Sequence, residues 1–395
     1  MSRNEPRRWN ILGNPDCRRV ARFQAALNQR GQLSAQLIDY ASVLGGDSSL
    51  TESLASGTLL RIESAAESFS TRRMLLAYGY DRAMAEGYQA ASPQQIERHT
   101  SAASIEFKPR QLYLGFQRLL QEVDEVCAAS GCLPVQAPTD IACMYDKWHC
   151  QQLLAAAGIA VPKLLGRIQS WDHLRELTGN DGRTMVKMAH GSGGVGCIAL
   201  HWSHGRVRAF MSSQTLAMAA PELADLSVPI QVLSDERSLA YVIEQLVPEQ
   251  IHLEHWLAKA KHQGNPFDLR VVVIAGRPRH AIARVGRSPF TNLNLGGQRL
   301  GLDQLDGSER VNLWSQVESM AAKVANCFPQ TLSFGLDLLL TPTGQLNVLE
   351  VNAFGDLLLN VLSEGQDPYA AEIAATEAWI PSRSGDLSTT GIAVA

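Results

Sequence analysis

Short apolar stretches near the C-terminus predict a β-hairpin. The first covers Ser333–Leu340 and the second begins at Leu346, with a Thr-Pro-Thr-Gly turn between them. Glu350 and Asn352 are two positions apart on the second strand, so both side chains leave the same face. Asp337 lies on the partner strand and can reach that face if it points the same way. We expect this hairpin to bring two carboxylates and an amide oxygen together.

An oxygen-only set between apolar neighbours suits Mg²⁺ carrying phosphate better than zinc or iron. Burying these polar groups without a cation would be costly. The alternative is a hairpin whose polar residues are simply solvated. We therefore predict Asp337, Glu350 and Asn352 as ligands of Mg²⁺, with Mn²⁺ also possible.

The N-terminal third shows strand and helix patterns in turn. A strand near residues 9–13 ends in a Gly/Pro turn and is followed by a helix from Arg18 to Gln29. Another strand is expected near 58–64, and helices over 72–90 and 109–130. These patterns predict an α/β domain over roughly 1–135. We expect the rest to divide into 136–248, 249–380 and a mobile tail, rich in Ser, Thr and Gly, over 381–395.

A glycine-rich run follows the predicted strand that carries Lys187. It matches the dinucleotide-binding spacing, but that motif needs a helix after the loop, whereas an apolar strand begins at Cys197. The pattern therefore predicts a flap whose backbone N–H groups cover phosphates, with Lys187 as a point charge. The alternative is a flexible surface loop, and the signatures of protein kinases and P-loops are absent. The flap residues assigned to nucleotide binding are Gly191, Ser192, Gly193 and Gly194.

Two arginines lie on a further predicted hairpin, over 268–275 and 280–285. Arg270 and Arg284 suit a spread phosphoryl charge, although a surface ion pair is the alternative for either. The following loop contains Asn294, which could hold a reacting carboxyl-phosphate. We assign catalytic roles to these three residues. The sequence His252-Leu-Glu-His255 has no identifiable third zinc ligand and is predicted to be a solvated helix face.

Composition excludes several classes of protein. The chain has 395 residues, 45% hydrophobic and 19% charged, with a net charge of −4, so nothing favours nucleic acid as a partner. Seven scattered cysteines without a Cys-x-x-Cys pair indicate a reducing compartment. Neither a signal peptide nor a membrane span is apparent. We expect a cytoplasmic protein.

In this order, the motifs resemble the ATP-grasp superfamily, in particular its glutathione-synthetase-like and RimK-like carboxylate–amine ligases. The similarity extends over about 140–365 and implies a pre-ATP-grasp α/β domain followed by a two-lobed α+β fold with antiparallel sheets. The motifs are Asp146-Lys147, Val186-Lys187 with the glycine run, 243–247, Asp268-Leu-Arg270, Arg284, 292–297, Asp337 and Glu350-Val-Asn352.

The resemblance implies ATP held between the two lobes. Adenine would lie on a strand over 240–248, contacting the backbone of Gln245 and Val247 with Glu244 beside it. Lys147 and Lys187 would contact phosphates. The implied reaction is ADP-forming: a carboxylate becomes an acyl-phosphate, which an amine or a thiol attacks. Substrates would be small molecules or peptides, and a homo-oligomer is possible. The alternatives are a small-molecule kinase with the same fold and a non-catalytic ATP sensor.

Three departures from the RimK-like pattern concern the substrate. Asn294 and Leu295 stand where the related loop usually has His and Arg, and Ala-Phe-Gly-Asp follows Asn352 in place of the common small residue, Pro and Gly. The usual ribose-binding carboxylate is not evident, with Glu249 the candidate. Asp356 is predicted to recognise a cationic acceptor, or else to cap a helix.

Overall fold

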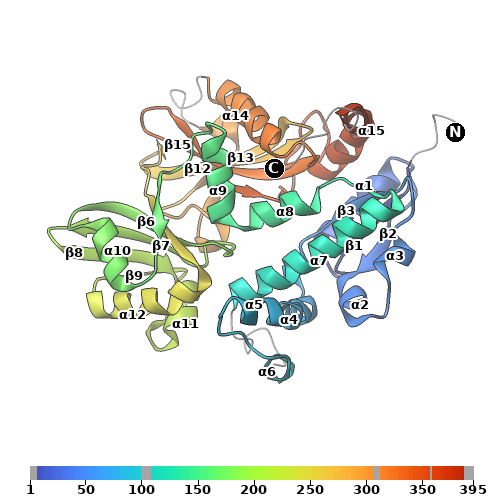
Figure 1. Cartoon of the computed structure of the whole chain (residues 1–395). Coiled ribbons are helices and arrows are strands. Elements are labelled where there is room, and N and C mark those ends of the chain that lie inside the picture. The colour runs from blue at the N-terminus through green and yellow to red at the C-terminus, as the bar shows by residue number, and fades with distance from the viewer. Residues whose placement is uncertain (1–6, 99–107, 306–311, 356–357, 387–395) are drawn as a thin grey trace.

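The computed structural model describes residues 7–98, 108–305, 312–355 and 358–386, apart from the side chains of 66 and 381–386. These described residues form three sheets (Figure 1). One is parallel, in the order β2-β1-β3-β4, and two are antiparallel, in the orders β5-β10-β6-β7-β8-β9 and β14-β13-β12-β15-β16. This arrangement confirms the predicted fold class, an α/β domain followed by two lobes with antiparallel sheets.

The N-terminal domain surrounds the parallel sheet. The predicted strand and helix at its start are both present as β1 and α1. The helix expected over 72–90 is two helices, which meet at Gly79, where a Cβ would lie 2.2 Å from the carbonyl oxygen of Gln111 in α7. The chain can therefore cross the long helix closely only at a glycine. The elements are β1 Trp9–Gly13, α1 Arg18–Gln29, β2 Gln36–Asp39, α2 Tyr40–Gly45, α3 Leu50–Ser53, β3 Leu59–Ile62, α4 Phe69–Tyr78, α5 Tyr80–Ala85, α6 Pro93–Glu97, α7 Pro109–Ser130 and β4 Leu133–Pro134.

The small lobe is an antiparallel sheet whose apolar face is covered by three helices, α10, α11 and α12. Its last strand, β10, ends at His255, so the predicted boundary at 248 falls too early. The elements are β5 Leu164–Arg167, α10 Trp171–Thr178, β6 Gly182–Met188, β7 Cys197–Ser203, β8 Arg206–Ser212, α11 Ser213–Ala219, β9 Ile230–Leu233, α12 Glu236–Leu246 and β10 Ile251–His255.

The strand predicted over 240–248 is wrong, because these residues are mostly helix α12. Leu239, Val242 and Leu246 are buried in the lobe's core, at the spacing of one helical face. The side chain of Asp235 caps the helix by accepting a hydrogen bond from the backbone N–H of Ser238 at 2.8 Å. The apolar residues therefore follow the helical period.

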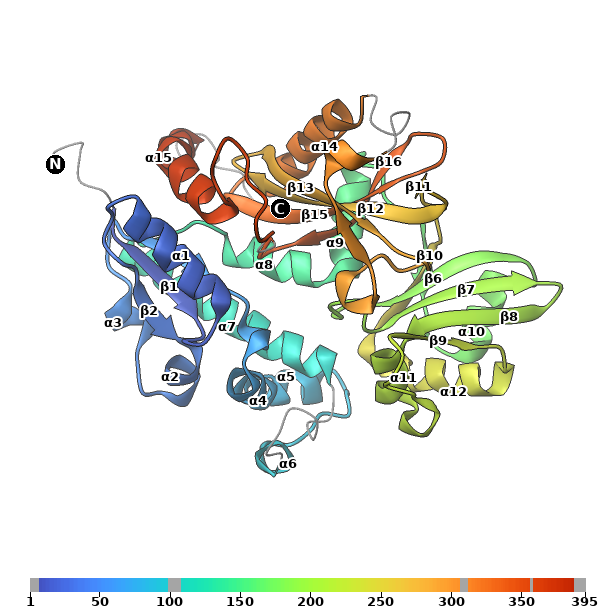
Figure 2. The same cartoon turned by 180° about the vertical axis from the view of Figure 1, so that it is seen from behind.

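The central lobe contains the C-terminal hairpin. Helices α8 and α9 pack on this lobe, although the sequence placed residues from 136 onwards in the small lobe. Figure 2 shows the sheet from behind, with α14 lying along it. The elements are α8 Pro138–Tyr145, α9 Lys147–Ala156, β11 Lys261–His262, β12 Asn265–Ile274, β13 Arg277–Val285, β14 Gln298–Leu300, α14 Leu313–Cys327, β15 Ser333–Leu340 and β16 Leu346–Asn352.

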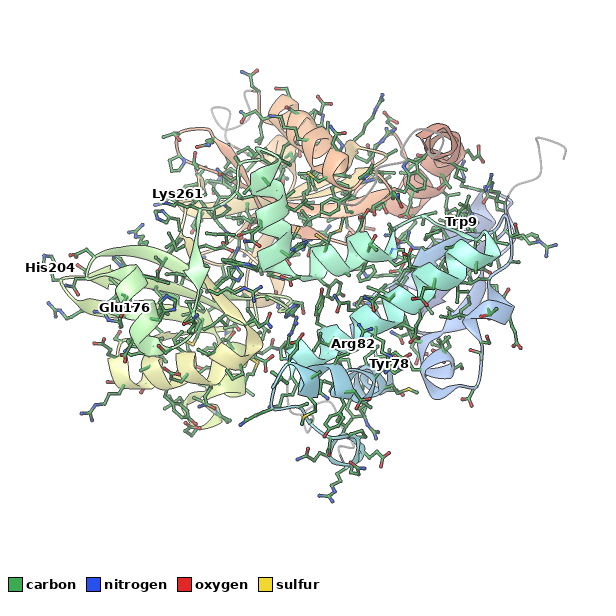
Figure 3. The ribbon with its side chains drawn as sticks, viewed as in Figure 1. Trp9, Tyr78, Arg82, Glu176, His204 and Lys261 are labelled. Atoms are coloured by element: carbon green, nitrogen blue, oxygen red, sulfur yellow. The ribbon has the colours of Figure 1, made fainter. Side chains whose placement is uncertain are left out.

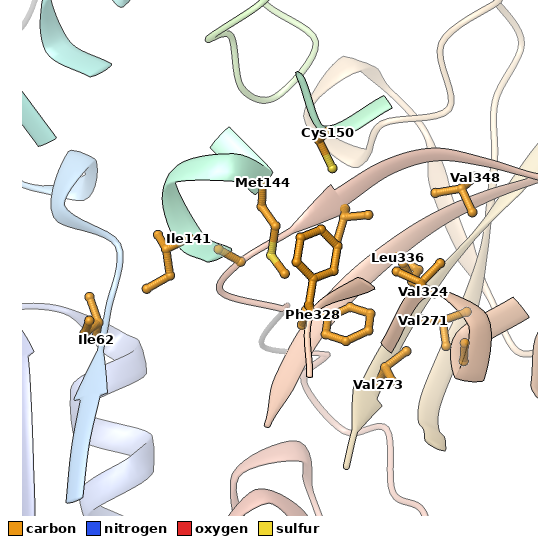
Figure 4. Close-up of a cluster of buried hydrophobic side chains, with 14 of the residues drawn as sticks. Ile62, Ile141, Met144, Cys150, Val271, Val273, Val324, Phe328, Leu336 and Val348 are labelled. Atoms are coloured by element: carbon orange, nitrogen blue, oxygen red, sulfur yellow. The ribbon is translucent and has the colours of Figure 1, made fainter. Parts of the chain in front are cut away.

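Successive side chains of β12 point alternately to the apolar core of this lobe and to the opposite face of the sheet. Val271 and Val273 lie in the apolar cluster of Figure 4, together with Met144 of α8 and Val324 of α14. The residues between them point to the opposite face, and towards the start of the strand that face carries charged side chains. One face of the sheet is therefore packed by helices, and the part of the other face near Asp268 and Arg270 carries the charged groups.

The C-terminal helix α15, Pro368–Asp386, returns to the N-terminal domain and packs beside α1 (Figure 1). Its Glu372 is buried and paired with Arg61 of β3, which also bonds Glu63 at 2.7 Å. The tail predicted to be mobile from 381 is thus helical to 386, and 387–395 lie outside the described residues.

In Figure 3, Trp9 of the N-terminal domain and His204 of the small lobe mark opposite sides of the molecule. None of the helices described has the length and apolar character needed to cross a membrane.

Candidate active site between the two antiparallel sheets

A cavity of about 100 Å³ lies between the small lobe and the central lobe. Its walls come from β6, β7 and the glycine flap on one side, and from the central sheet on the other. The segment that leaves β10 lines it as well. The lining includes Lys147, Met185, Lys187, 191–195, Cys197, 254–257, Lys259, Asp268, Arg284, Phe290, Asn292, Asp337, Leu339, Leu349 and Glu350.

The hairpin places the predicted acidic residues at one end of this cavity. Asp337 and Glu350 are opposite each other in the β15–β16 register, so they share a face as the prediction required. Asn352 lies further along the same face of β16, beyond the cavity lining. Oδ1 of Asp337 is buried and makes no well-aligned hydrogen bond among the described residues, although Nε of Arg270 lies 3.0 Å away. This hard oxygen donor set fits Mg²⁺, whose remaining ligands are commonly water and substrate phosphate.

Both predicted arginines lie at this end of the site and are not exposed surface residues. Arg284 Nε donates to Oδ1 of Asp268 at 2.8 Å, and its Nη2 lies 3.1 Å from Oδ2 of Asp337. Arg270 Nε lies 3.0 Å from Oδ1 of Asp337. Burial alone would lower the pKa of Arg284, but Asp337 and Asp268 hold it above its usual value. The arginine therefore remains charged and fixed in position.

Lys259 extends this network and was missed in the sequence. Its Nζ donates to Oδ2 of Asp268 at 3.0 Å and to Oγ1 of Thr291 at 2.6 Å. Burial lowers the pKa of Lys259, against the opposing effect of Asp268. The sequence points to only one of these partners. Asp268 belongs to a recognisable motif, whereas Lys259 lies in a polar stretch without periodicity.

The two predicted phosphate-binding lysines face the cavity from different elements. Nζ of Lys147, at the start of α9, lies 2.7 Å from Oε1 of Glu350. Nζ of Lys187, on β6, lies 2.7 Å from Oε2 of the buried Glu254. Burial alone would raise the pKa of Glu254, but Lys187 and His252 hold it below its usual value. Both lysines are thus held at the cavity by carboxylates.

The glycine run forms a strand–loop–strand flap between β6 and β7, as predicted. Gly193 and Gly194 have φ values of +62° and +84°, which favour glycine. Nδ2 of Asn294 donates to the carbonyl oxygen of Gly193 at 2.8 Å, and a Cβ on Gly194 would lie 2.7 Å from Leu295 Cδ1. Asn294 therefore contacts the flap across the cavity mouth, while its neighbour Asn292 lines the cavity.

The sequence placed adenine beside a strand over 240–248, but the structure has mostly helix there. Glu244, Gln245 and Val247 do not line the cavity, and Oε1 of Glu244 accepts a hydrogen bond from the backbone N–H of Trp171 at 2.6 Å. The segment that leads from the small lobe to the central lobe is instead 254–257, which begins at the end of β10 and does line the cavity. The error arose because α12 was interpreted as the last strand of the lobe.

Two further sequence assignments are also corrected. The candidate ribose ligand, Glu249, is bonded to Tyr88 and accepts a hydrogen bond from the backbone N–H of Arg110 at 2.9 Å, so it connects to the N-terminal domain. His252 is buried on β10 and lies 2.9 Å from Glu254, which excludes the predicted solvated helix face. Within the described ranges, no group of three His, Cys, Asp or Glu side chains could hold a metal. Asp356 lies outside the described residues.

Comparison with known proteins agrees with this geometry. A family model described as YheC/D like ATP-grasp matches residues 141–355. No curated protein sequence gives a match. Among solved structures, the ATP-grasp ligase PsnB in complex with precursor peptide PsnA2 and AMPPNP has a TM-score of 0.52 at 14% identity, over 96% of this chain and 100% of that one.

Two other solved structures share the fold. The ADP complex of PurK, N5-carboxyaminoimidazole ribonucleotide synthetase, has a TM-score of 0.55 at 11% identity, covering 95% of this chain and 78% of that one. The D-cycloserine synthetase DcsG has a TM-score of 0.51 at 14% identity, covering 94% and 98%. At these identities the likeness shows a common fold.

Proposed function

The chain belongs to the YheC/D-like ATP-grasp family, and from this premise we propose that it is an ATP-dependent, ADP-forming ligase that joins a carboxylate to an amine. One observation carries the proposal. Lys187 and a glycine flap from the small lobe meet Lys147, Arg284 and carboxylates from the central lobe in a single cavity. Such a site supplies positioning and charge stabilisation, which is what phosphoryl transfer needs from a protein.

Each group has a role in this scheme. Lys147 and Lys187 bind the phosphates of ATP, and the flap's backbone N–H groups cover them. Asp337, Glu350 and Asn352 would hold Mg²⁺, which would neutralise phosphate charge. The segment 254–257 borders the adenine, beside an apolar wall that includes Met185 and Leu339.

The arginines stabilise the group being transferred. The substrate carboxylate attacks the γ-phosphorus, ADP leaves, and an acyl-phosphate forms. The guanidinium of Arg284, already oriented by Asp268 and Asp337, faces the charge on the phosphoryl oxygens, and Arg270 supports it. The amine nitrogen then attacks the acyl carbon and inorganic phosphate leaves, so that one C–N bond replaces the C–O bond of the acyl-phosphate.

The substrates belong to the class of small molecules or peptides. PsnB is described with a precursor peptide, and DcsG as a D-cycloserine synthetase, so relatives of this fold include both kinds. We propose that the protein acts in the cytoplasm and that it can form a homo-oligomer.

The test is mass spectrometry of the purified protein incubated with Mg-ATP and a low-molecular-mass cell extract. The proposal predicts a new mass equal to two metabolites less water, together with ADP and phosphate. A metabolite that gains only a phosphoryl group would instead identify a kinase. Tight ATP binding without turnover by any carboxylate and amine, peptides included, would identify a nucleotide sensor.

A further inference from the structure

The N-terminal domain meets the small lobe through a few polar and aromatic side chains. Within the parts of the chain that the structure describes, no helix or strand of that domain packs extensively on an element of the small lobe. The connection is made by Glu249, just before β10, which is bonded to Tyr88 and to the backbone N–H of Arg110. Arg110 is the second residue of α7, and Figure 1 shows this helix running from beside the small lobe into the N-terminal domain.

The side chain of Arg110 extends this connection to the base of the flap. Its Nε and Nη2 donate to the two carboxylate oxygens of Glu86 at 2.9 and 2.5 Å, which fixes the guanidinium plane. The remaining arm, Nη1, lies 3.2 Å from Nε2 of His190. The ring of Tyr113, one turn along α7, stacks on the same histidine with a centroid separation of 4.0 Å and an interplanar angle of 28°. Two side chains of the helix therefore hold His190.

His190 lies between two residues whose backbone carbonyls bond Lys147. The residue before it, Ala189, accepts a hydrogen bond from the backbone N–H of Lys147 at 2.9 Å, and the residue after it, Gly191, accepts one from Nζ of the same lysine. Asp146, which caps α9 through the backbone N–H of His149, lies 3.6 Å from His190 Nε2. A displacement of His190 would thus move both backbone carbonyls that hold a phosphate-binding lysine.

We propose that Arg110, Tyr113 and His190 form a latch through which the N-terminal domain fixes the base of the glycine flap over the nucleotide. The inference rests on the proposed function, because it assumes that the flap covers phosphates. Neither Arg110 nor His190 lines the cavity, so both act through the flap as positioning residues. A flap with several glycines at positive φ loses much conformational freedom when it closes, and a fixed base reduces that cost.

The test compares Arg110→Ala with Arg118→Ala in the full chain. Arg118 is a matched control because it lies on the same helix, pairs with Glu122 at 3.4 Å and packs over the ring of Tyr78, which is labelled in Figure 3. The latch predicts about tenfold weaker binding of Mg–AMPPNP by Arg110→Ala in calorimetry, the size of an ordinary coupling between sites. It also predicts faster amide hydrogen exchange over 189–196 without nucleotide. Arg118→Ala should match the wild type in both measurements.

Further variants keep the inference testable if Arg110→Ala does not fold. Glu249→Gln weakens the same connection from the small lobe, and His190→Gln removes the stacked ring; each should reproduce the faster exchange. Arg110→Lys keeps the charge but loses the paired bonds to Glu86, so it should restore only part of the protection. Unchanged exchange over 189–196 in a folded Arg110→Ala, Glu249→Gln or His190→Gln variant overturns the latch. Failure of the wild type to bind Mg–AMPPNP would instead contradict the proposed function, while the exchange measurement would still decide whether the contact exists.

Discussion

The two halves of the site are built differently. In the central lobe, the charged groups stand on neighbouring strands, where register alone places Asp268 opposite Arg284 and Asp337 opposite both Arg270 and Glu350. In the small lobe, most of the groups that we propose to bind the nucleotide belong to a loop, whose position depends on contacts with other segments. Strand pairing therefore fixes the groups of the central lobe, whereas the flap of the small lobe depends on contacts with other segments for its position. Substitutions should have their largest effects in the first half and smaller effects in the second.

The largest effect is expected for Glu350→Gln. It removes one of two carboxylates from the metal site, so Mg²⁺-dependent turnover should fall by about 100-fold or more, as for other groups that stabilise transition-state charge. ADP release with the identified substrates measures it, and circular dichroism checks the fold. The control is Glu364→Gln, whose carboxylate is 78% exposed and paired with Arg279. Equal activity of the two variants would mean that the hairpin has been misassigned.

Lys187→Ala should affect both binding and stability. It removes the proposed phosphate contact and leaves Glu254 buried, at 1% exposure, without its lysine partner. We expect about tenfold weaker Mg–AMPPNP binding and a loss of about 3 kcal/mol in the free energy of unfolding. The double variant Lys187→Met/Glu254→Gln removes both charges and should recover stability but not affinity. Unchanged affinity in the single variant would count against the flap assignment.

Gly194→Ala tests how closely the flap approaches the central lobe. Its φ of +84° is unfavourable for alanine, and the new Cβ would lie 2.7 Å from Leu295. Nucleotide affinity should fall about fivefold, equivalent to roughly 1 kcal/mol. Gly205→Ala is the control, because it has a similar φ of +74° but no atom within 4 Å of the added Cβ. If both variants bind equally well, the contact between flap and central lobe is unimportant for binding.

The smallest effect is expected for Glu244→Gln. This side chain lies on the exposed face of α12 and accepts a hydrogen bond from the backbone of Trp171. Nucleotide affinity should remain within about twofold of the wild type, a difference below 0.5 kcal/mol. A strong loss of affinity would restore the original assignment of 244–247 to adenine.

The sequence predicted the central lobe's half of the site well because its information is local. Glu350 and Asn352 share a face by the two-residue period of a strand, and a Pro/Gly turn marks the hairpin. The same rule failed for 240–248, where an apolar run without turn signals is ambiguous between strand and helix. It also failed for β10, because both faces of that strand are buried, and Glu254 bonds both His252 and Lys187 there.

Contacts between segments that are distant in the sequence could not be predicted from local sequence patterns. Lys259 acquires its role from Asp268 and Thr291, and Glu249 from Tyr88 and from a helix that starts about 140 residues earlier. The order of the motifs nevertheless identified the superfamily, because the spacing of chemical groups along the chain reflects the topology of both sheets.

The most direct test of the central claim is amide hydrogen exchange with and without Mg–AMPPNP. The account predicts protection over 191–196, in the flap, and over 254–257, between the lobes, with no change over 236–246 in α12. Protection of 244–247 without protection of 254–257 would contradict the placement of the nucleotide between the two sheets.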